Sequence, residues 1–146
     1  MELYISIAAL VVSVVSFIVS IVTYCLGIVR EKRQATLDAF NLMQFQVFDR
    51  LNYYRKYDID EIAEDIHSAD YKDISGLLAR CAHFAVGVNT GIYDFNTVRR
   101  LAGRYIIALY DKMLPMIEKK RTLNSSERHY QEFEILVNKM RRLYKK

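Results

Sequence analysis

The sequence predicts an all-α protein with one long apolar helix near its N-terminus, and three observations lead to this prediction. The first is a run of 27 residues without a charged side chain, from Leu3 to Val29. The second is that five glycines and one proline supply little turn chemistry, which favours a few long helices over many strands. The third is that apolar residues recur at helical spacing through the rest of the chain.

The apolar run divides the 146 residues into two predicted parts. Residues 1–29 form a transmembrane helix, because at about 1.5 Å per residue the run reaches about 40 Å, more than the hydrocarbon core of about 30 Å. A cleaved signal peptide is disfavoured, because Glu2 stands where such peptides carry a base and the run is longer than their apolar region. Residues 30–146 form one helical domain of four or five helices packed as a bundle.

Charged residues at the end of the run predict its orientation. Arg30, Lys32 and Arg33 follow Val29 directly, whereas the other end has only the α-amino group and Glu2. The positive-inside rule therefore places the bundle in the cytoplasm, the N-terminus outside, and these three bases at the membrane surface.

Small residues recur along the predicted transmembrane helix in alternating steps of three and four. They are Ser6, Ala9, Ser13, Ser16, Ser20, Thr23 and Gly27. Such residues let neighbouring helices approach closely, and their hydroxyls can bond across the interface, so we expect a homo-oligomer. The alternative is that the hydroxyls bond back to their own helix.

The same stripe is compatible with two kinds of assembly. In a ring of more than about four subunits it would face a central lumen, where uncharged polar groups suit a pore. In a dimer or tetramer it would be a dry interface. The sequence leaves both open.

Helical periodicity continues through residues 30–146. We expect helices over 30–57, continuous with the membrane span, over 58–69, from Tyr71 or Ser75 to Asn89, and from Asp94 or Asn96 onward. Gly91 would end the third of these, and Pro115 would kink the fourth or end its regular part. A last helix would begin at Asn124, where Glu127 completes a pattern like a capping box. The expected apolar faces comprise Leu37, Phe40, Val47 or Phe48, Leu51 and Tyr54; Ile59, Ile62, Ala63 and Ile66; Leu77, Leu78, Cys81, Phe84, Ala85 and Val88; Val98, Leu101, Ala102, Tyr105, Ile106, Leu109, Tyr110 and Met113; and Tyr130, Phe133, Leu136, Val137, Met140 and Leu143.

Charge is unevenly distributed in the bundle. Seven carboxylates and one lysine lie between Asp58 and Asp73, in a chain with a net charge of +4. An acidic segment on one subunit and bases on the next would allow head-to-tail contacts in a ring. The bases of 119–121 and of the C-terminal tail suit anionic lipid, nucleic acid phosphate or simple solvation.

Residues that commonly carry chemistry do not form a recognisable site. The two cysteines, Cys25 and Cys81, lie in different predicted environments and predict no disulfide, and the three histidines lack the spacing of a zinc site. We therefore predict no metal and no cofactor. Helical bundles that cleave RNA commonly carry an Arg that is separated from the catalytic His by four to six intervening residues. Here Arg80 with His83, and Arg121 with His129, are off that spacing, and His83 shares the expected core face of its helix.

One block of sequence carries a resemblance. The block reads His83-Phe84-Ala85-Val86-Gly87-Val88-Asn89-Thr90-Gly91-Ile92-Tyr93-Asp94, and it is followed by Arg100-Leu101-Ala102-Gly103 and Glu118-Lys119-Lys120-Arg121. Together these segments resemble a family of small bacterial single-span membrane proteins of uncharacterised function. The resemblance implies residence in the inner membrane and makes Asn89, Thr90, Gly91, Tyr93 and Arg104 candidates for a shared role. A tight turn between helices is the simpler explanation for the first four.

The overall plan is also similar to the small membrane accessory proteins of RNA-targeting CRISPR systems, which combine one span, a nuclease-related bundle and a ring that permeabilises the inner membrane during phage infection. That likeness implies a pore-forming or membrane-perturbing effector in phage defence, with an RNA-guided defence complex as a possible partner. The alternatives are a tethered interaction module without a pore and a tethered ribonuclease centred on His83 or His129. Nucleic acid is the less favoured partner.

Overall fold

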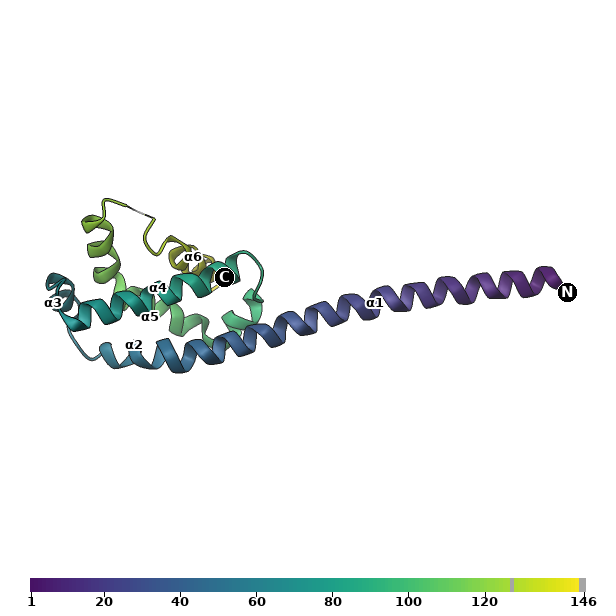
Figure 1. Cartoon of the computed structure of the whole chain (residues 1–146), viewed down its shortest axis with the longest axis horizontal. Helices are drawn as coiled ribbons and strands as arrows, with labels where there is room; N and C mark the ends of the chain where they lie inside the picture. The colour runs from purple at the N-terminus through teal and green to yellow at the C-terminus, as the bar shows by residue number, and fades with distance from the viewer. Residues whose placement is uncertain (127, 145–146) are drawn as a thin grey trace.

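The computed structural model describes residues 1–126 and 128–144, and this part of the chain contains helices and no strand. The elements in order are α1 (Glu2–Met43), the π-helix η1 (Gln44–Phe48), α2 (Asp49–Tyr54), α3 (Ile59–Glu64), α4 (Ala69–Asn89), α5 (Phe95–Leu123) and α6 (Gln131–Tyr144). Figure 1 shows a bundle packed along the C-terminal end of α1 and along α2, from which most of α1 projects alone. The all-α prediction is confirmed.

The projecting part of α1 is apolar and uncovered. Leu10 is 66% exposed and Phe17 is 67% exposed. Both belong to a continuous apolar surface that is larger than the apolar patches soluble proteins ordinarily expose to water. Within the described residues, this is the one helix long and apolar enough to cross a membrane. The helix continues without a break from the apolar run into the bundle, as the sequence predicted.

A π-helical turn joins α1 to α2. Because this turn holds one residue more than an α-helical turn, the buried face shifts along the sequence. Val47 and Phe48 are therefore buried together, where the sequence pattern left open which one faced the core. The carbonyl of Phe48, at the end of this turn, accepts a hydrogen bond of 3.0 Å from the Tyr105 hydroxyl.

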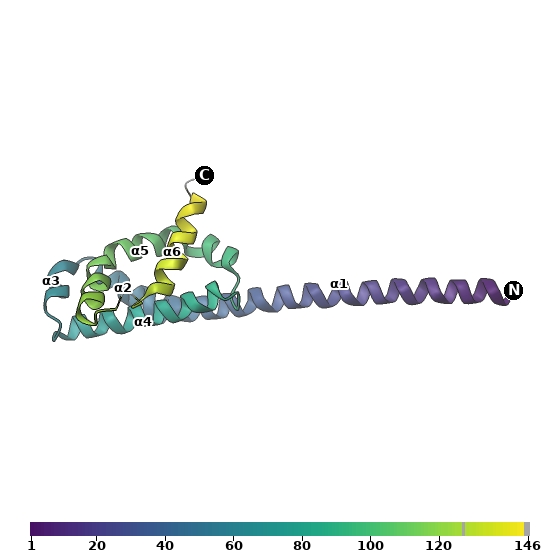
Figure 2. The same ribbon diagram turned by 90° about the horizontal axis from the view of Figure 1, so that it is seen from above.

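The core lies between the C-terminal end of α1 with α2 and the helices α4, α5 and α6, as Figure 2 shows from above. Large side chains from η1, α4, α5 and α6 are fully buried, among them Phe48, Leu78, Ile106 and Phe133. Most expected core positions are confirmed. Leu37, Leu101 and Leu143 are not, because they lie at the edges of their apolar faces and are 36%, 49% and 44% exposed.

Side-chain caps mark where the middle helices begin. Asp58 accepts from the N–H of Asp60 at the start of α3, and Ser68 accepts from that of Tyr71 at the start of α4. Asp94 caps α5 by accepting from the N–H of Thr97. Of the two expected α5 caps, Asp94 is thus confirmed, whereas α4 begins earlier than predicted because Ser68 caps it.

The last helix begins later than predicted. Asn124 follows α5 as its C-terminal cap residue, and α6 begins only at Gln131. Two non-glycine residues with positive φ, Ser125 and Tyr130, lie in the connection, so it does not follow a helical path. The predicted partner of Asn124 in a capping box, Glu127, lies outside the described residues.

Pro115 does not end its helix, because α5 continues to Leu123. The non-helical backbone in α5 lies instead at Ala102, with φ of −148° and ψ of 19°. Alanine favours helix more than any other residue, so no sequence pattern predicted an interruption there.

Candidate functional site

The small residues of α1 lie on the face opposite the bundle. Thr36 is fully buried against the bundle, and it follows Gly27 by nine residues, about two and a half helical turns. Gln34 and Asn41, which follow Gly27 at intervals of seven, are exposed. Since α1 is one unbroken α-helix over this region, the small-residue face and the bundle point to opposite sides of its axis.

Two hydroxyls of the stripe bond within the helix. Ser20 donates to the carbonyl of Ser16 at 2.9 Å, and Thr23 donates to that of Val19 at 2.8 Å. Each hydroxyl oxygen still has lone pairs that can accept a hydrogen bond from a neighbouring chain. The intrahelical bonds are therefore compatible with helix association.

The base of the apolar run is tied to the turn between α4 and α5. The Thr36 hydroxyl donates to the carbonyl of Lys32 at 2.7 Å and accepts the N–H of Asp94 at 2.7 Å. The turn thus lies beside the bases that follow the run, of which Arg30 and Arg33 are exposed and Lys32 is half-buried. Figure 1 shows this turn at the end of the bundle from which α1 projects.

The block that carried the resemblance forms this turn. Gly91 has a φ of +83°, a conformation that glycine adopts without strain. Tyr93 donates its N–H to the carbonyl of Gly87 at 2.9 Å and stacks its ring on Phe84, with centroids 5.5 Å apart. A Cβ on Gly87 would lie 2.5 Å from the Tyr93 ring, so close packing at this turn requires glycine there.

Asn89 and Thr90 also have structural partners at the end of α4. The Asn89 amide donates to the backbone carbonyl of Glu132 at 2.9 Å and to its carboxylate at 2.8 Å, which ties α4 to α6. The Thr90 hydroxyl donates to the carbonyl of Val86 at 2.8 Å. These contacts support the prediction that the block acts as a helix-to-helix turn.

Electrostatics at the turn favour an ionised Asp94. The hydrogen bond from the Thr97 hydroxyl contributes most to lowering the pKa of the Asp94 carboxyl, and the charges of Arg33 and Lys32 lower it further. The carboxylate therefore stays charged near neutral pH, close to the bases of α1.

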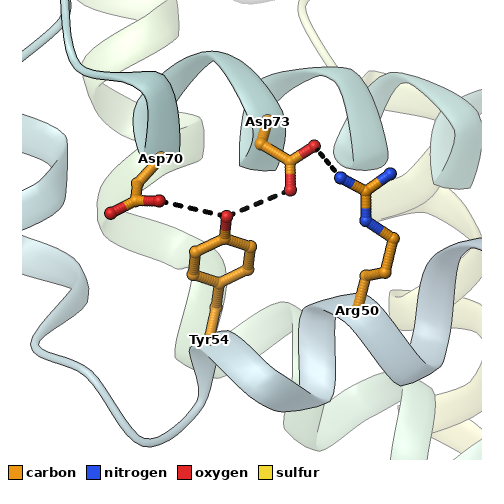
Figure 3. Close-up of polar contacts among 4 residues, drawn as sticks. All are labelled: Arg50, Tyr54, Asp70 and Asp73. Atoms are coloured by element: carbon orange, nitrogen blue, oxygen red, sulfur yellow. Dashed lines mark hydrogen bonds and ion pairs between the residues drawn. The ribbon is translucent and has the colours of Figure 1, made fainter.

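A second polar cluster lies at the opposite end of the bundle (Figure 3). The Tyr54 hydroxyl contacts Asp70 at 3.2 Å and Asp73 at 3.1 Å, and Arg50 pairs with Asp73 at 2.5 Å. Burial, followed by the hydrogen bond to Asp73, raises the pKa of Tyr54 well above its usual value. Two of the seven carboxylates in the acidic segment, Asp70 and Asp73, thus connect α4 to α2 through these contacts.

The remaining candidates are dispersed. Arg80 and His83 line one groove of about 370 Å³ between α1 and α4. His83 is exposed, so its expected place in the core is wrong. Arg104 is exposed with its guanidinium 5.6 Å from the centre of the Tyr144 ring. His129 precedes α6 rather than lying in its first turn, and it is half-buried.

The cysteines and acidic residues suggest no metal site. Among the described residues, no group of three or more His, Cys, Asp or Glu side chains is placed to hold a metal ion. Cys25 is exposed and Cys81 is buried. Burial raises the pKa of the Cys81 thiol to about 12, so this thiol is unreactive near neutral pH.

Sequence reasoning missed the two contacts that organise the ends of the bundle. Thr36 carries an isolated hydroxyl on the bundle side of α1. Arg50 and Tyr54 are four residues apart, a spacing that places two side chains on the same face of a helix. Those spacings were visible. Their partners at Asp94, Asp70 and Asp73 depend on how α4 and α5 fold back, which spacing does not reveal.

Comparison with protein families finds a match to a domain of unknown function, DUF4760, over residues 10–140. The matched region begins within the apolar part of α1 and ends within α6, so it includes both parts of the structure. No curated protein and no solved structure matches the chain.

Proposed function

Since the chain belongs to the DUF4760 family, whose function is unknown, we propose from its own structure that it is a homo-oligomeric single-pass membrane protein. In this proposal the apolar part of α1 crosses the inner membrane of a bacterium. The bundle lies in the cytoplasm and the N-terminus outside in this proposal, which the positive-inside rule supports through Arg30, Lys32 and Arg33.

The exposed surface of α1 supports the membrane assignment. Its leucine, isoleucine, valine and phenylalanine side chains are about half exposed or more from Leu3 to Val29. Water would make so large an apolar surface unfavourable, whereas lipid would solvate it. A chain with this surface therefore needs a bilayer or other copies around α1.

The oligomer is supported by one observation: the small-residue face of α1 and the face that contacts the bundle lie on opposite sides of the helix. Ser13, Ser16 and Ser20 lie on the side away from Thr36 and hence away from the bundle. Several copies can bring their small residues together at a central axis while their bundles lie outside. If the stripe were on the bundle side, the bundles would collide before the helices touched.

Within this assembly we propose a pore as the activity to test first. A ring would place the serine and threonine hydroxyls around a lumen without charged side chains, a lining that would pass ions. A membrane-perturbing role in phage defence stays a prediction from the resemblance in plan. So does an RNA-guided defence complex as partner.

The mass of the purified assembly in detergent, combined with conductance in planar bilayers, tests the proposal. A ring of six or more subunits with conductance supports a pore, whereas a dimer excludes a central one. Ser13→Leu, Ser16→Leu and Ser20→Leu together should reduce the assembly and abolish conductance. Val11→Leu, Val15→Leu and Val22→Leu add bulk to the opposite face and should leave both unchanged.

The groove shared by Arg80 and His83 favours a second candidate, a membrane-tethered ribonuclease. An arginine and an imidazole in one groove can together bind a phosphate and transfer a proton. RNA cleavage by the purified protein that is lost in His83→Ala would support it and would count against the pore. The serine variants should leave such cleavage intact.

A further inference from the structure

A cavity of about 390 Å³ lies where α1 leaves its apolar run and α5 begins. Arg33 enters it from α1, and Asp94, Asn96, Thr97 and Arg100 enter it from the start of α5. Both arginines are exposed. The cavity thus combines two guanidinium groups with an amide and a hydroxyl.

We infer that this cavity binds the phosphate of an anionic phospholipid headgroup, an inference that rests on the proposed crossing of the membrane by α1. Guanidinium groups form charge-assisted, often bidentate, hydrogen bonds with phosphate oxygens. The ion pairs seen in residues 1–126 and 128–144 involve neither Arg33 nor Arg100. Both cations are therefore available to a phosphate.

The depth of the cavity fits a headgroup. Arg33 is four residues beyond Val29, which places it about 6 Å past the apolar run. The headgroup layer on each side of a bilayer is about 5–8 Å thick. With Val29 at the edge of the hydrocarbon core, Arg33 lies within the layer that holds lipid phosphates.

The α4–α5 turn lies at a similar depth. A Cβ on Gly91 would be 3.8 Å from Lys32 Nζ, so the turn folds back to the level of the first bases of α1. Ile92, next in the chain, is 63% exposed. An apolar side chain at the tip of a membrane-facing turn can enter the interface, while the bases beside it bind the headgroups.

The charge around the cavity favours an anion. Asp94 offsets one of the two arginines that line it, and its carboxylate is already engaged by the N–H and hydroxyl of Thr97. Lys32, whose charge lowers the pKa of Asp94, is a further base near the cavity, and Arg30 precedes it on α1. The surplus of positive charge next to the apolar run complements the negative surface of the cytoplasmic leaflet.

The test uses the full chain reconstituted in nanodiscs that contain phosphatidylcholine and phosphatidylglycerol, with the lipid retained by the protein measured by native mass spectrometry. The wild-type chain should retain phosphatidylglycerol preferentially. Each of Arg33→Gln and Arg100→Gln should weaken this preference by about fivefold, the factor that one base contributes at a membrane surface. Lys72→Gln removes the same single charge at the opposite end of the bundle and should have no effect.

Other outcomes separate the inference from its premise. A protein inserted in the membrane whose lipid preference is unchanged by both arginine variants contradicts the headgroup site alone. A second result would also contradict the headgroup site: inorganic phosphate protects the detergent-solubilised protein against thermal unfolding, while the protein shows no preference for phosphatidylglycerol. The site would then bind a soluble anion. Arginine variants that change the subunit number but not the lipid preference would assign the cavity to a protein contact. A chain released from membranes by alkaline carbonate contradicts the proposed function as well.

Discussion

The backbone N–H of Asp94 donates a hydrogen bond of 2.7 Å to the hydroxyl oxygen of Thr36, which is fully buried. Through this bond the start of α5 is fixed to α1 just beyond the apolar run. A movement of α1 along or about its axis would therefore be transmitted to the bundle through this contact.

Replacing Thr36 by valine should destabilise the bundle. The change preserves shape but leaves the N–H of Asp94 buried without an acceptor, a loss of about 1–3 kcal/mol in the free energy of unfolding. Chemical denaturation in detergent, followed by circular dichroism, measures it. Thr36→Ser keeps the hydroxyl and should cost less than the valine variant, and equal losses in the two variants would contradict the role of this bond.

Tyr54 should make stability depend on alkaline pH. Its pKa is raised in the folded chain, first by burial and then by its bond to Asp73, so the folded state favours the protonated hydroxyl. The contribution is complete below about pH 10, the ordinary pKa of tyrosine. It is lost as the pH rises above that value, because the unfolded chain then releases the proton more readily.

Comparison of wild type with Tyr54→Phe isolates this effect from other titrating groups. At pH 8 the variant should be less stable by about 1 kcal/mol, the contribution of one hydrogen bond. The difference between the two proteins should shrink or reverse by pH 11. A difference that stays constant from pH 8 to pH 11 would show that Tyr54 does not titrate in this way.

The two glycines of α4 should respond oppositely to alanine. A Cβ on Gly87 would overlap the Tyr93 ring, so Gly87→Ala should destabilise the chain by about 1–3 kcal/mol. A Cβ on Gly76 would meet nothing within 4 Å. Gly76→Ala should therefore stabilise α4 by up to about 1 kcal/mol through helix propensity. Thermal unfolding of both variants checks the contrast, and a stabilising Gly87→Ala would contradict the packing of the turn.

The features of this fold that depend on a pattern repeated over many residues were predictable from sequence. The absence of charge from Leu3 to Val29, and the apolar spacing that continues beyond Arg33, predicted one helix running from the apolar run into the bundle. The cap at Asp94 and the turn at Gly91 were also found, because capping and positive φ depend on local residue chemistry.

Features set by tertiary packing were not predictable. The π-helical turn at Gln44–Phe48 has no residue signature, and the interruption at Ala102 lies in a residue that favours helix. Pro115 suggested that the helix would kink or end there, but α5 continues to Leu123. At the candidate site, the small-residue stripe was visible in sequence, whereas its position opposite the bundle required knowing that Thr36 is buried.

The headgroup inference makes Ile92 a position for a depth probe. The chain contains no tryptophan, so Ile92→Trp introduces a single fluorophore. In liposomes its emission should shift to the blue, and lipids brominated near the headgroup should quench it. Tyr57→Trp, at the opposite end of the bundle, should show neither effect. Equal quenching at both positions, or at neither, would contradict the placement of the α4–α5 turn at the membrane.

The central claim, that copies of the chain associate through the face of α1 opposite the bundle, is tested most directly by disulfide cross-linking in membranes. Cys25 is a natural control, because it lies eleven residues before Thr36, about three turns, and so on the bundle side of α1. A disulfide needs Cα atoms within about 7 Å, which restricts it to residues at a close interface. On mild oxidation, Ser20→Cys in a Cys25→Ala background should give covalent dimers, and the wild-type chain with Cys25 alone should not. Cross-linking through Cys25, or none through position 20, would contradict the account.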